Sequence, residues 1–410
     1  MNGQVLTRQA RQALGSQFEA IDWQTQQSLQ RVLAAFHQHR VGVQHFASVS
    51  GYGHADLGRQ CLDAVFAEVF AAEAAAVRIQ FVSGTHAIAA CLYGILRPGD
   101  ELLSVAGAPY DTLAEVIGIR GQGQGSLQDF SVDYRQLELT AVGELDWDAL
   151  TTAIRPQTKM VLIQRSCGYA WRQSLAIADI AKIIAVVKAQ NPETICFVDN
   201  CYGEFIEAQE PTAVGADLMA GSLIKNPGGT IATTGGYVAG RADLVELACC
   251  RLTAPGIGAD GGATLDQNRL LFQGLFLAPQ MVGEAMKGGH LIGHVCQELG
   301  YAVNPMPDQP RRDLIQAIQL GSPEKLIAFC RAIQAHSPIG SYLDPVPAAM
   351  PGYTSELVMA GGTFIDGSTS EFSADGPLRE PYIVFCQGGT HWTHIAIALT
   401  AAVDALTELG

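Results

Sequence analysis

Short apolar runs and amphipathic stretches alternate along the chain between about residue 60 and residue 240. The apolar runs are bounded by turn residues, and they include ELLSVAG (101–107), KMVLIQ (159–164) and TICFVDN (194–200). The stretches between them, such as 60–76 and 175–190, have the apolar spacing of helices. Continuous apolar runs that alternate with helices are typical of parallel strands covered on both faces. The pattern therefore predicts an α/β fold with a mainly parallel sheet.

The two ends of the chain have a different pattern. The first 45 or so residues have the spacing of helices, and a long helix is predicted over 281–299. A second helix, a Gly/Pro-rich passage and a final strand (381–387) and helix (394–406) follow. We therefore expect an N-terminal helical segment (1–45), a large α/β domain (46–280) and a smaller α+β C-terminal domain (281–410).

Composition narrows the class of protein. The 410 residues are 48% hydrophobic and 16% charged, which excludes an intrinsically disordered chain. The balance of 25 Lys+Arg against 40 Asp+Glu gives a net charge of −15, which argues against a nucleic-acid partner. No apolar stretch is long enough for a membrane span, and the N-terminus lacks the apolar core of a signal peptide. We therefore expect a cytoplasmic protein without a membrane partner.

The ten cysteines are expected to be reduced and buried. None forms a CxxC pair, and several lie inside apolar runs, such as Cys196 and Cys386. Clustered ligands at zinc spacing are absent, and no acidic cluster has the spacing of a metal-binding loop. We predict no metal site.

In open α/β sheets, ligands bind outside the carboxyl ends of the strands, so polar residues that follow apolar runs are candidates for a site. The first is Ser83-Gly84-Thr85, which precedes the helical stretch AIAACLYGIL. Small residues at a helix N-terminus leave free backbone N–H groups that suit a phosphate. A plain Ser/Thr helix cap explains the same residues, and for this motif alone it is favoured roughly two to one.

Two further candidates follow later strands. Asp199 ends the apolar run TICFV, where a carboxylate is costly unless it meets a cation or a strong donor. A cap on the next helix is an equally good explanation of Asp199 alone. Lys225 lies between apolar residues and a glycine-rich turn (GSLIKNPGG), where desolvation favours the neutral amine. A neutral amine is what a Schiff base to an aldehyde cofactor requires.

Taken together, the three candidates indicate a specific cofactor. A phosphate loop, an aspartate at a strand end and a lysine 26 residues later follow the order found in pyridoxal-phosphate (PLP) enzymes of the aspartate aminotransferase fold type. In this interpretation Lys225 holds the aldehyde, Asp199 pairs with the pyridine nitrogen, and residues 83–85 hold the phosphate.

Longer segments resemble a known family. They are SGYGHADLGR (50–59), VRIQFVSGTHAIAACLYGILRPGDELLSV (77–105), GAPYDTL (107–113), IQRSCGYAWRQSL (163–175), FVDNCYGEF (197–205), GSLIKNPGGTIATTGGYVAGR (221–241) and FSADGPLREPYIVFCQGG (372–389). They are similar to the methionine gamma-lyase-like group, whose members are often labelled aluminium resistance protein or cystathionine beta-lyase. The resemblance implies fold type I, PLP, and a homodimer or homotetramer whose active sites are shared between subunits.

The resemblance also implies roles for individual residues. Lys225 matches the family lysine that forms the internal aldimine, and Asp199 matches the partner of the pyridine nitrogen. Gly84 and Thr85, next to Ser83, match the phosphate loop of the transsulfuration enzymes, and Ser222 resembles a further phosphate-binding hydroxyl. Tyr110 lies where those enzymes stack an aromatic ring on the cofactor, with its hydroxyl near the leaving group.

Three more residues complete the predicted site. Tyr52 and Arg59 are candidates for a phosphate contact from the adjacent subunit, and Arg379 is the candidate for the substrate carboxylate. Some positions depart from the transsulfuration pattern. Ile224 replaces the small hydroxyl residue that precedes the lysine, and the spacing between Tyr52 and Arg59 is longer. Tyr202 is more like the aminotransferases, where a tyrosine binds the phenolic oxygen of the cofactor.

These residues favour a PLP-dependent carbon–sulfur lyase that acts on cystathionine, cysteine or methionine by β- or γ-elimination. Lys225 would take the α-proton, and Tyr110 would assist departure of the sulfur group. Another PLP reaction, such as transamination, aldol cleavage or racemisation, would use the same residues. A PLP-binding stress-response protein without meaningful turnover is an alternative of a different class.

Overall fold

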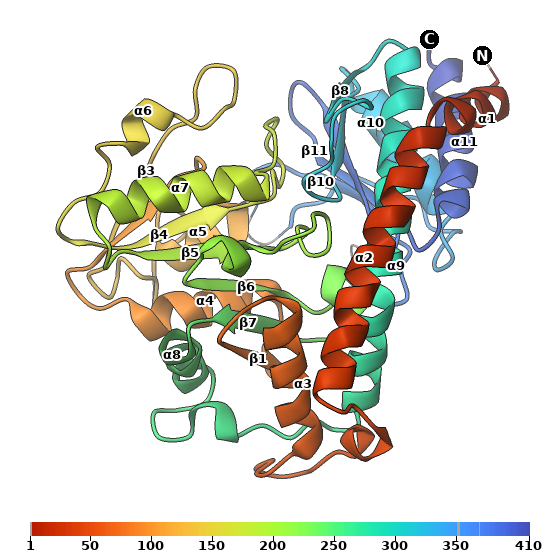
Figure 1. Ribbon diagram of the computed structural model, residues 1–410. Coiled ribbons are helices and arrows are strands. Elements are labelled where there is room, and N and C mark those ends of the chain that lie inside the picture. Colours follow the sequence, from red (N-terminus) through yellow and green to blue (C-terminus); the bar gives the residue numbers. More distant parts are fainter. Residues whose placement is uncertain (1, 351–352, 369) are drawn as a thin grey trace.

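The computed structural model describes residues 2–350, 353–368 and 370–410, which form two β-sheets with helices packed around them (Figure 1). The large sheet has the spatial order β1-β7-β6-β5-β4-β2-β3. Its strands are β1 (Ala74–Arg78), β2 (Glu101–Ser104), β3 (Asp133–Gln136), β4 (Thr158–Gln164), β5 (Ile195–Asp199), β6 (Leu218–Ser222) and β7 (Gly236–Gly240). Neighbouring strands from β3 to β6 pair in parallel, whereas β7 pairs antiparallel with both β6 and β1. The predicted α/β class with a mainly parallel sheet is confirmed.

Helices cover both faces of the large sheet. They are α3 (Leu57–Val69), α4 (Gly84–Ile95), α5 (Asp111–Ile117), α6 (Trp147–Leu150), α7 (Ile177–Gln190) and α8 (Ala242–Leu252). Alternate residues of β5 point to opposite sides, so Val198 packs into the core that contains α3 and α7, while Phe197 packs into the core that contains α4 and α8. Burial on both faces explains why this strand is an unbroken apolar run.

The smaller sheet is antiparallel, with the order β10-β11-β12-β9-β8. Its strands are β8 (Ala302–Asn304), β9 (Gln316–Gln319), β10 (Leu357–Ala360), β11 (Ser373–Pro377) and β12 (Ile383–Gln387). Two helices, α10 (Pro323–Ala335) and α11 (Trp392–Glu408), share a separate apolar core with this sheet. The expected α+β character of the C-terminal part is therefore present.

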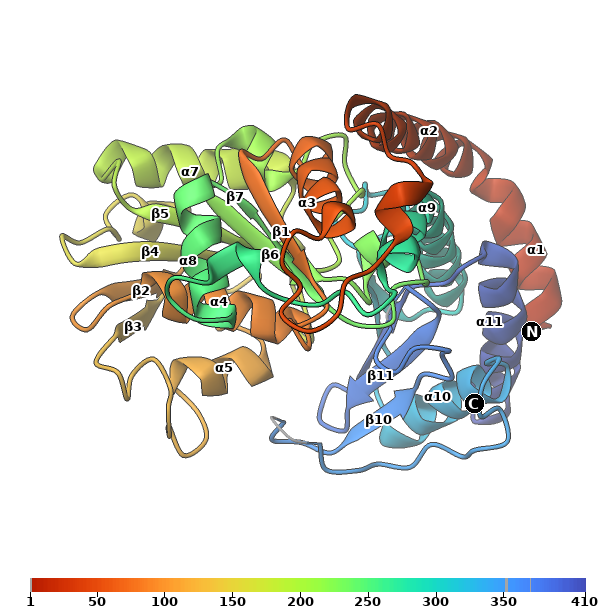
Figure 2. The same cartoon turned by 90° about the horizontal axis from the view of Figure 1, so that it is seen from below.

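The two N-terminal helices pack against helices of both parts of the molecule. α1 (Gly3–Ala13) packs on α11, and α2 (Gly15–Gln38) lies alongside α9 (Asn268–Glu298), as Figures 1 and 2 show. The long predicted helix exists but begins at Asn268, before Pro279, rather than at residue 281. Its buried residues join both cores, since Leu275 belongs to the large one and Leu291 to the small one. The three-part division at residues 45 and 280 stays a prediction.

One predicted helix is partly wrong. The stretch 60–76 is helical only as far as Val69, and Ala74–Ala76 belong to β1. Alanine favours helices, but here the three alanines pair with Val238–Gly240 of β7. Pairing in the sheet and burial override the local preference.

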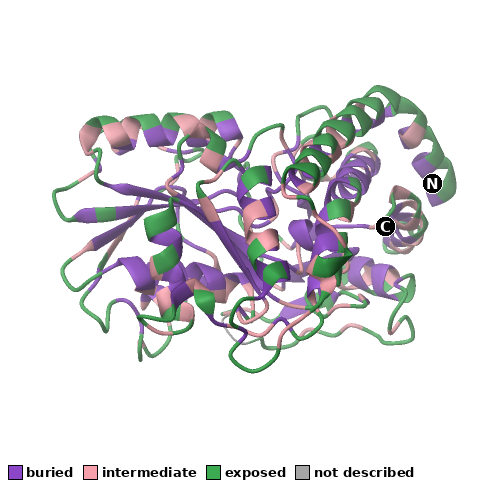
Figure 3. Ribbon diagram, turned by 60° about the horizontal axis from the view of Figure 1, so that its bottom comes forward, coloured by how far each residue is buried: buried purple, intermediate pink, exposed green. Residues whose placement is uncertain are grey.

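Burial follows the same layers. Buried residues fill most strands of the large sheet, except the edge strand β3, and the inner faces of the helices, whereas exposed residues lie on the outer faces and loops (Figure 3). All ten cysteines are free. Eight are buried, as predicted, whereas Cys61 and Cys250 are partly exposed. Among the described residues, no helix is long and apolar enough to cross a membrane.

Candidate active site

A cavity of about 480 Å³ lies at the carboxyl ends of the central strands of the large sheet. From that sheet it is lined by residues at the ends of β4, β5 and β6, namely Gln164, Asp199 and Ser222. From the smaller sheet it is lined by Phe385 and Gln387 of β12. The carboxyl ends of parallel strands are where α/β folds bind ligands.

Asp199 and Lys225 lie on adjacent elements of this cavity. Asp199 ends β5 next to Ala220 of β6, and Lys225 follows β6 by three residues. Asp199 Oδ1 accepts a hydrogen bond from the Cys201 backbone N–H at 3.1 Å. Burial raises the pKa of Asp199, and the nearby Lys225 amine opposes that rise. Their strand pairing therefore brings an acid and an amine to one site.

The Lys225 amine lies over the ring of Tyr202, with Nζ 3.9 Å from the ring centroid. Tyr202 has a φ of 69°, a left-handed conformation that turns the chain sharply after β5. Burial lowers the pKa of Lys225, but the acidic groups around it, Cys201, Tyr202 and Asp199 first among them, hold it above its ordinary value. The expectation that burial leaves Lys225 neutral is thus not met in the chain alone, because the neighbouring acidic groups, Cys201 first among them, together outweigh desolvation.

The first turn of α4 forms a second wall. Ser83 Oγ caps the helix by accepting from His86 N at 3.1 Å, as the simpler alternative predicted, and Ser83 also lines the cavity. The backbone N–H groups of Gly84 and Thr85 donate to no group in the part of the chain that the structure describes. A Cβ at Gly84 would lie 3.0 Å from Ser222 Cβ and 3.3 Å from Cys201 Sγ. Glycine therefore fits best at this position, and the free N–H groups of the helix N-terminus form a cradle for an anion.

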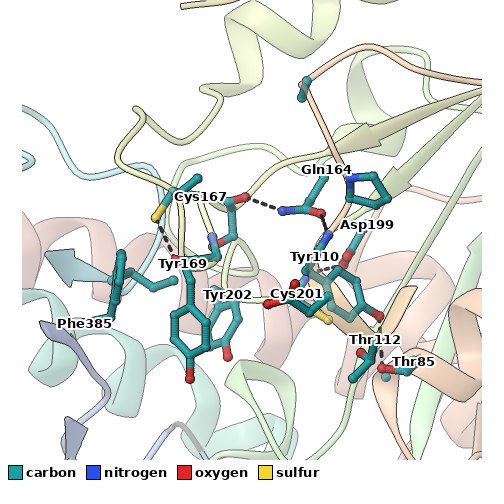
Figure 4. A pocket seen from close by; sticks show the side chains of 18 of the residues that line it. Thr85, Tyr110, Thr112, Gln164, Cys167, Tyr169, Asp199, Cys201, Tyr202 and Phe385 are labelled. Carbon is teal, nitrogen blue, oxygen red and sulfur yellow. Dashed lines mark hydrogen bonds between the residues drawn. The ribbon is translucent and has the colours of Figure 1, made fainter. Parts of the chain in front are cut away.

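Tyr110 precedes α5 and is held at both ends (Figure 4). Its backbone N–H donates to Gln164 Oε1 at 2.9 Å, and its hydroxyl donates to Thr85 Oγ1 at 3.0 Å. Burial raises the pKa of Tyr110 far above its ordinary value, and the Asp199 charge adds to that shift. The ring is therefore fixed between the ends of β4 and α4, with its hydroxyl turned toward the anion cradle.

The remaining predicted residues divide into two groups. Arg379 lines the cavity, is exposed, and has no carboxylate within 4.0 Å among the described residues. Tyr52 and Arg59 do not line the cavity of their own chain. Tyr52 is 84% exposed, whereas Arg59 is 2% exposed and donates to the carbonyls of Gly53, Asp260 and Gly262. Contact of either residue with a neighbouring subunit stays a prediction.

Several residues that line the cavity were not predicted from the sequence. Gln164 and Gln387 end apolar runs, so the criterion that found Asp199 could have found them as well. Tyr169 lies in the connection after β4, and no local pattern distinguishes it. The buried Asp375, which accepts from Tyr169 and Gln387, lies 206 residues from Tyr169. Such a contact can be found only in the folded chain.

The methionine gamma-lyase family model matches residues 4–407. The chain belongs to the methionine gamma-lyase family. Its relatives include the uncharacterized protein YnbB of Bacillus subtilis, which is 50% identical over 379 residues, 92% of this chain and 90% of that protein.

Solved structures of the family have the same fold. A protein of Listeria monocytogenes, provisionally described as a cystathionine beta-lyase involved in aluminium resistance, is 48% identical with a TM-score of 0.96 over 98% of this chain and 100% of that one. A carbon-sulfur lyase involved in aluminium resistance from Clostridium novyi NT is 45% identical with a TM-score of 0.94, over 98% and 95%. The PLP-dependent protein YhfS of Escherichia coli, at 17% identity and a TM-score of 0.62 over 93% and 96%, shares the fold alone. The family member described here therefore has the fold of the type I PLP-dependent enzymes.

Proposed function

We propose that this chain is a PLP-dependent enzyme that cleaves a carbon–sulfur bond of an amino acid, with cystathionine, cysteine and methionine as candidate substrates. One observation carries the proposal. Asp199 and Lys225 follow adjacent parallel strands and line the same cavity as the free N-terminus of α4. A carboxylate, an amine and an anion cradle are the three groups that such a cofactor needs.

The cavity fits the cofactor by its donor set. The free N–H groups of Gly84 and Thr85 and the Ser222 hydroxyl, which lines the cavity, suit the phosphate. Asp199 would accept a hydrogen bond from the ring nitrogen, and the Lys225 amine would hold the aldehyde carbon. The Tyr110 ring would cover one face, and the Tyr202 hydroxyl is a candidate for the phenolic oxygen.

When bound, PLP supplies an electron sink for negative charge at the substrate Cα. The Asp199 carboxylate, at the end of β5, would accept a hydrogen bond from the ring nitrogen and so keep a proton on it. Lys225 Nζ removes the Cα proton of the substrate, and the amine must be neutral to do so. The pKa of Lys225 is raised in the chain alone, so the amine would have to lose its proton when the cofactor and substrate bind.

Arg379 would bind the substrate carboxylate. Its guanidinium lines the cavity, and no carboxylate of the described chain competes for it. A guanidinium binds a carboxylate through two parallel hydrogen bonds, which would also fix the orientation of Cα over the Lys225 amine.

Product analysis tests the reaction. Because a family member from Clostridium novyi is described as a carbon-sulfur lyase, elimination is the reaction to test first. With cysteine as substrate, we expect pyruvate, ammonia and sulfide without any added keto acid. A requirement for a keto acid would indicate transamination instead. An unchanged spectrum across a broad panel of amino acids would indicate a PLP-binding protein without turnover.

The absorption spectrum of the purified protein before and after borohydride tests the cofactor. A yellow protein that is bleached, with pyridoxyl on Lys225 in the peptide map, is the expected result. Lys225→Ala should lose the colour change, while Lys159→Ala, at an exposed position of β4, should keep it. A colourless wild type that cannot be reconstituted would overturn the proposal.

We also propose a homodimer or homotetramer. Exposed apolar side chains surround the segment of Tyr52; they are Tyr52, Leu57, Val82, Ile257 and Leu265. These segments touch one another, since Gly262 N donates to Tyr52 O at 3.0 Å, and Val82 precedes the anion cradle. Sedimentation velocity should give a multiple of the chain mass, and Tyr52→Asp should shift it toward the monomer.

A further inference from the structure

The end of the cavity opposite Asp199 carries a second buried acid. This end is lined by Tyr169, Ile315, Tyr353, Arg379, Phe385 and Gln387. The Tyr169 ring packs against Tyr353 and Phe385, with centroid distances of 5.7 and 5.1 Å. Its position is therefore set by two aromatic neighbours, and its hydroxyl meets a carboxyl group of β11.

That carboxyl group belongs to Asp375. It is 3% exposed, it is hydrogen-bonded to the Tyr169 hydroxyl, and it accepts from Gln387 Nε2 at 3.1 Å. Among the described residues, no Lys, Arg or His side chain lies within 4.0 Å of it. Burial raises the pKa of Asp375 to about 7, and the Gln387 hydrogen bond only reduces that rise. A buried carboxyl without a cation holds its proton at neutral pH far more readily than an exposed one.

The hydrogen bond to Tyr169 can be made in two ways. When Asp375 is ionised, the Tyr169 hydroxyl donates to it. When Asp375 carries a proton, the carboxyl group can donate instead, and the Tyr169 hydroxyl hydrogen can point into the cavity. The Tyr169 hydroxyl can then donate its proton into the cavity and receive another from the Asp375 carboxyl group.

We propose that Tyr169 delivers the proton to the departing sulfur and that Asp375 replaces it. The inference rests on the proposed carbon–sulfur lyase function. As the carbon–sulfur bond breaks, both of its electrons stay on sulfur, the Tyr169 O–H bond breaks and an S–H bond forms. The Asp375 proton moves to the Tyr169 oxygen, and the Asp375 carboxylate is reprotonated from water before the next turnover.

The other phenol of the cavity is less suited to this step. The Tyr110 hydroxyl donates to Thr85 on the side of the anion cradle, and burial together with the Asp199 charge raises its pKa. The role of Tyr110 near the leaving group stays a prediction. We assign the proton donor to Tyr169 because its hydroxyl is hydrogen-bonded to a buried carboxyl group, whereas the Tyr110 hydroxyl is bonded to Thr85.

Leaving groups of different acidity test the proposal. S-ethyl-cysteine releases a weakly acidic thiol that needs a proton, whereas S-(2-nitrophenyl)-cysteine releases a strongly acidic one that does not. Tyr169→Phe should lower kcat/KM about 100-fold or more for the ethyl substrate and less than about threefold for the nitrophenyl substrate. Asp375→Asn should show the same selectivity with a smaller loss, and Tyr342→Phe, at an 87% exposed tyrosine, should change neither.

The outcomes separate the two proposals. An equal loss on both substrates, or no loss on either, overturns the role of Tyr169 while leaving the lyase function intact. A wild type that cleaves neither substrate overturns the lyase function and this inference with it.

A second measurement does not depend on turnover. The infrared spectrum of the chain without added cofactor at pH 6 should contain a protonated-carboxyl band that is lost in Asp375→Asn. Glu204, whose pKa is raised to about 8, has a protonated-carboxyl band of its own at this pH, so Glu204→Gln should remove that second band and leave the Asp375 band in place. If Asp375→Asn removes no such band, Asp375 is ionised and the proposal is overturned.

Discussion

The two ends of the cavity differ in how their charges are balanced. At the end formed by the large sheet, Asp199 and Lys225 influence each other, since the amine opposes the rise in the pKa of the acid. At the end formed by the smaller sheet, Asp375 has only the neutral partners Tyr169 and Gln387, and Arg379 has no carboxylate nearby within the described chain.

This difference follows from what each end is proposed to bind. In the proposed function the large-sheet end would keep one ligand throughout turnover, and its opposite charges would stabilise each other in a low-dielectric site. The smaller-sheet end would meet a new substrate in each cycle, so its guanidinium and its buried acid would be left for the substrate to use. Predictions that disturb one end at a time can separate these functions.

The largest effect is expected at Lys225. Lys225→Ala removes both the covalent anchor and the base, so turnover should fall to background in a product assay. The Lys159→Ala control should retain wild-type rates. Substantial residual turnover in Lys225→Ala would place the chemistry elsewhere.

A substitution at Arg379 tests the end of the cavity formed by the smaller sheet. Arg379→Lys keeps the charge but loses the two-pronged geometry, so kcat/KM should fall about 10- to 100-fold with PLP absorption unchanged. Arg269→Lys, on the exposed start of α9, is the matched control. Loss of the cofactor spectrum in Arg379→Lys would show that the two ends are not separate.

A substitution at Gly84 tests whether the anion cradle binds the phosphate. Gly84→Ala would place a Cβ 3.0 Å from Ser222 Cβ, so PLP should bind about tenfold more weakly in a titration followed by absorption. Gly15→Ala is the control, because a Cβ there meets nothing within 4 Å. Unchanged PLP affinity in Gly84→Ala would argue that the phosphate binds elsewhere.

A substitution at Glu204 is expected to have the smallest effect on activity but a measurable effect on stability. It is fully buried, its Oε1 accepts from the Tyr237 hydroxyl at 2.7 Å, and its Oε2 has no partner within the described chain. Burial raises its pKa to about 8 from 4.5. The native state therefore binds more protons than the unfolded state between these values, and stability falls as pH rises from about 5 to about 8.

Glu204→Gln should remove this part of the pH dependence. The free energy of unfolding in urea should lose less between pH 5 and pH 8 than in the wild type, by on the order of a few kcal/mol. Glu115→Gln, at an exposed position of α5, should keep the wild-type slope. An unchanged slope in Glu204→Gln would mean that Glu204 is ionised in the native state.

Local sequence was a good guide to the three residues proposed to hold the cofactor. Asp199, Ser83 and Lys225 were predicted from apolar runs that stop at a polar residue, and the folded chain brings all three to one cavity. The pKa of the Lys225 amine could not be predicted in this way, because it depends on the acidic groups that follow the neighbouring strand, Cys201 and Tyr202 before Asp199. The strand β1 was missed for a related reason, since its alanines are held by pairing with β7.

By itself, the sequence determined the α/β class, the family and the three residues proposed to hold the cofactor. These are encoded in runs of a few residues, because strand, turn and helix start follow one another along the chain. Only the tertiary structure decided that Tyr169, Asp375 and Gln387 form one hydrogen-bonded group. Those side chains come from separate segments, and only packing of the smaller sheet against the large one brings them together. The same packing withdraws Asp375 from water and so raises its pKa.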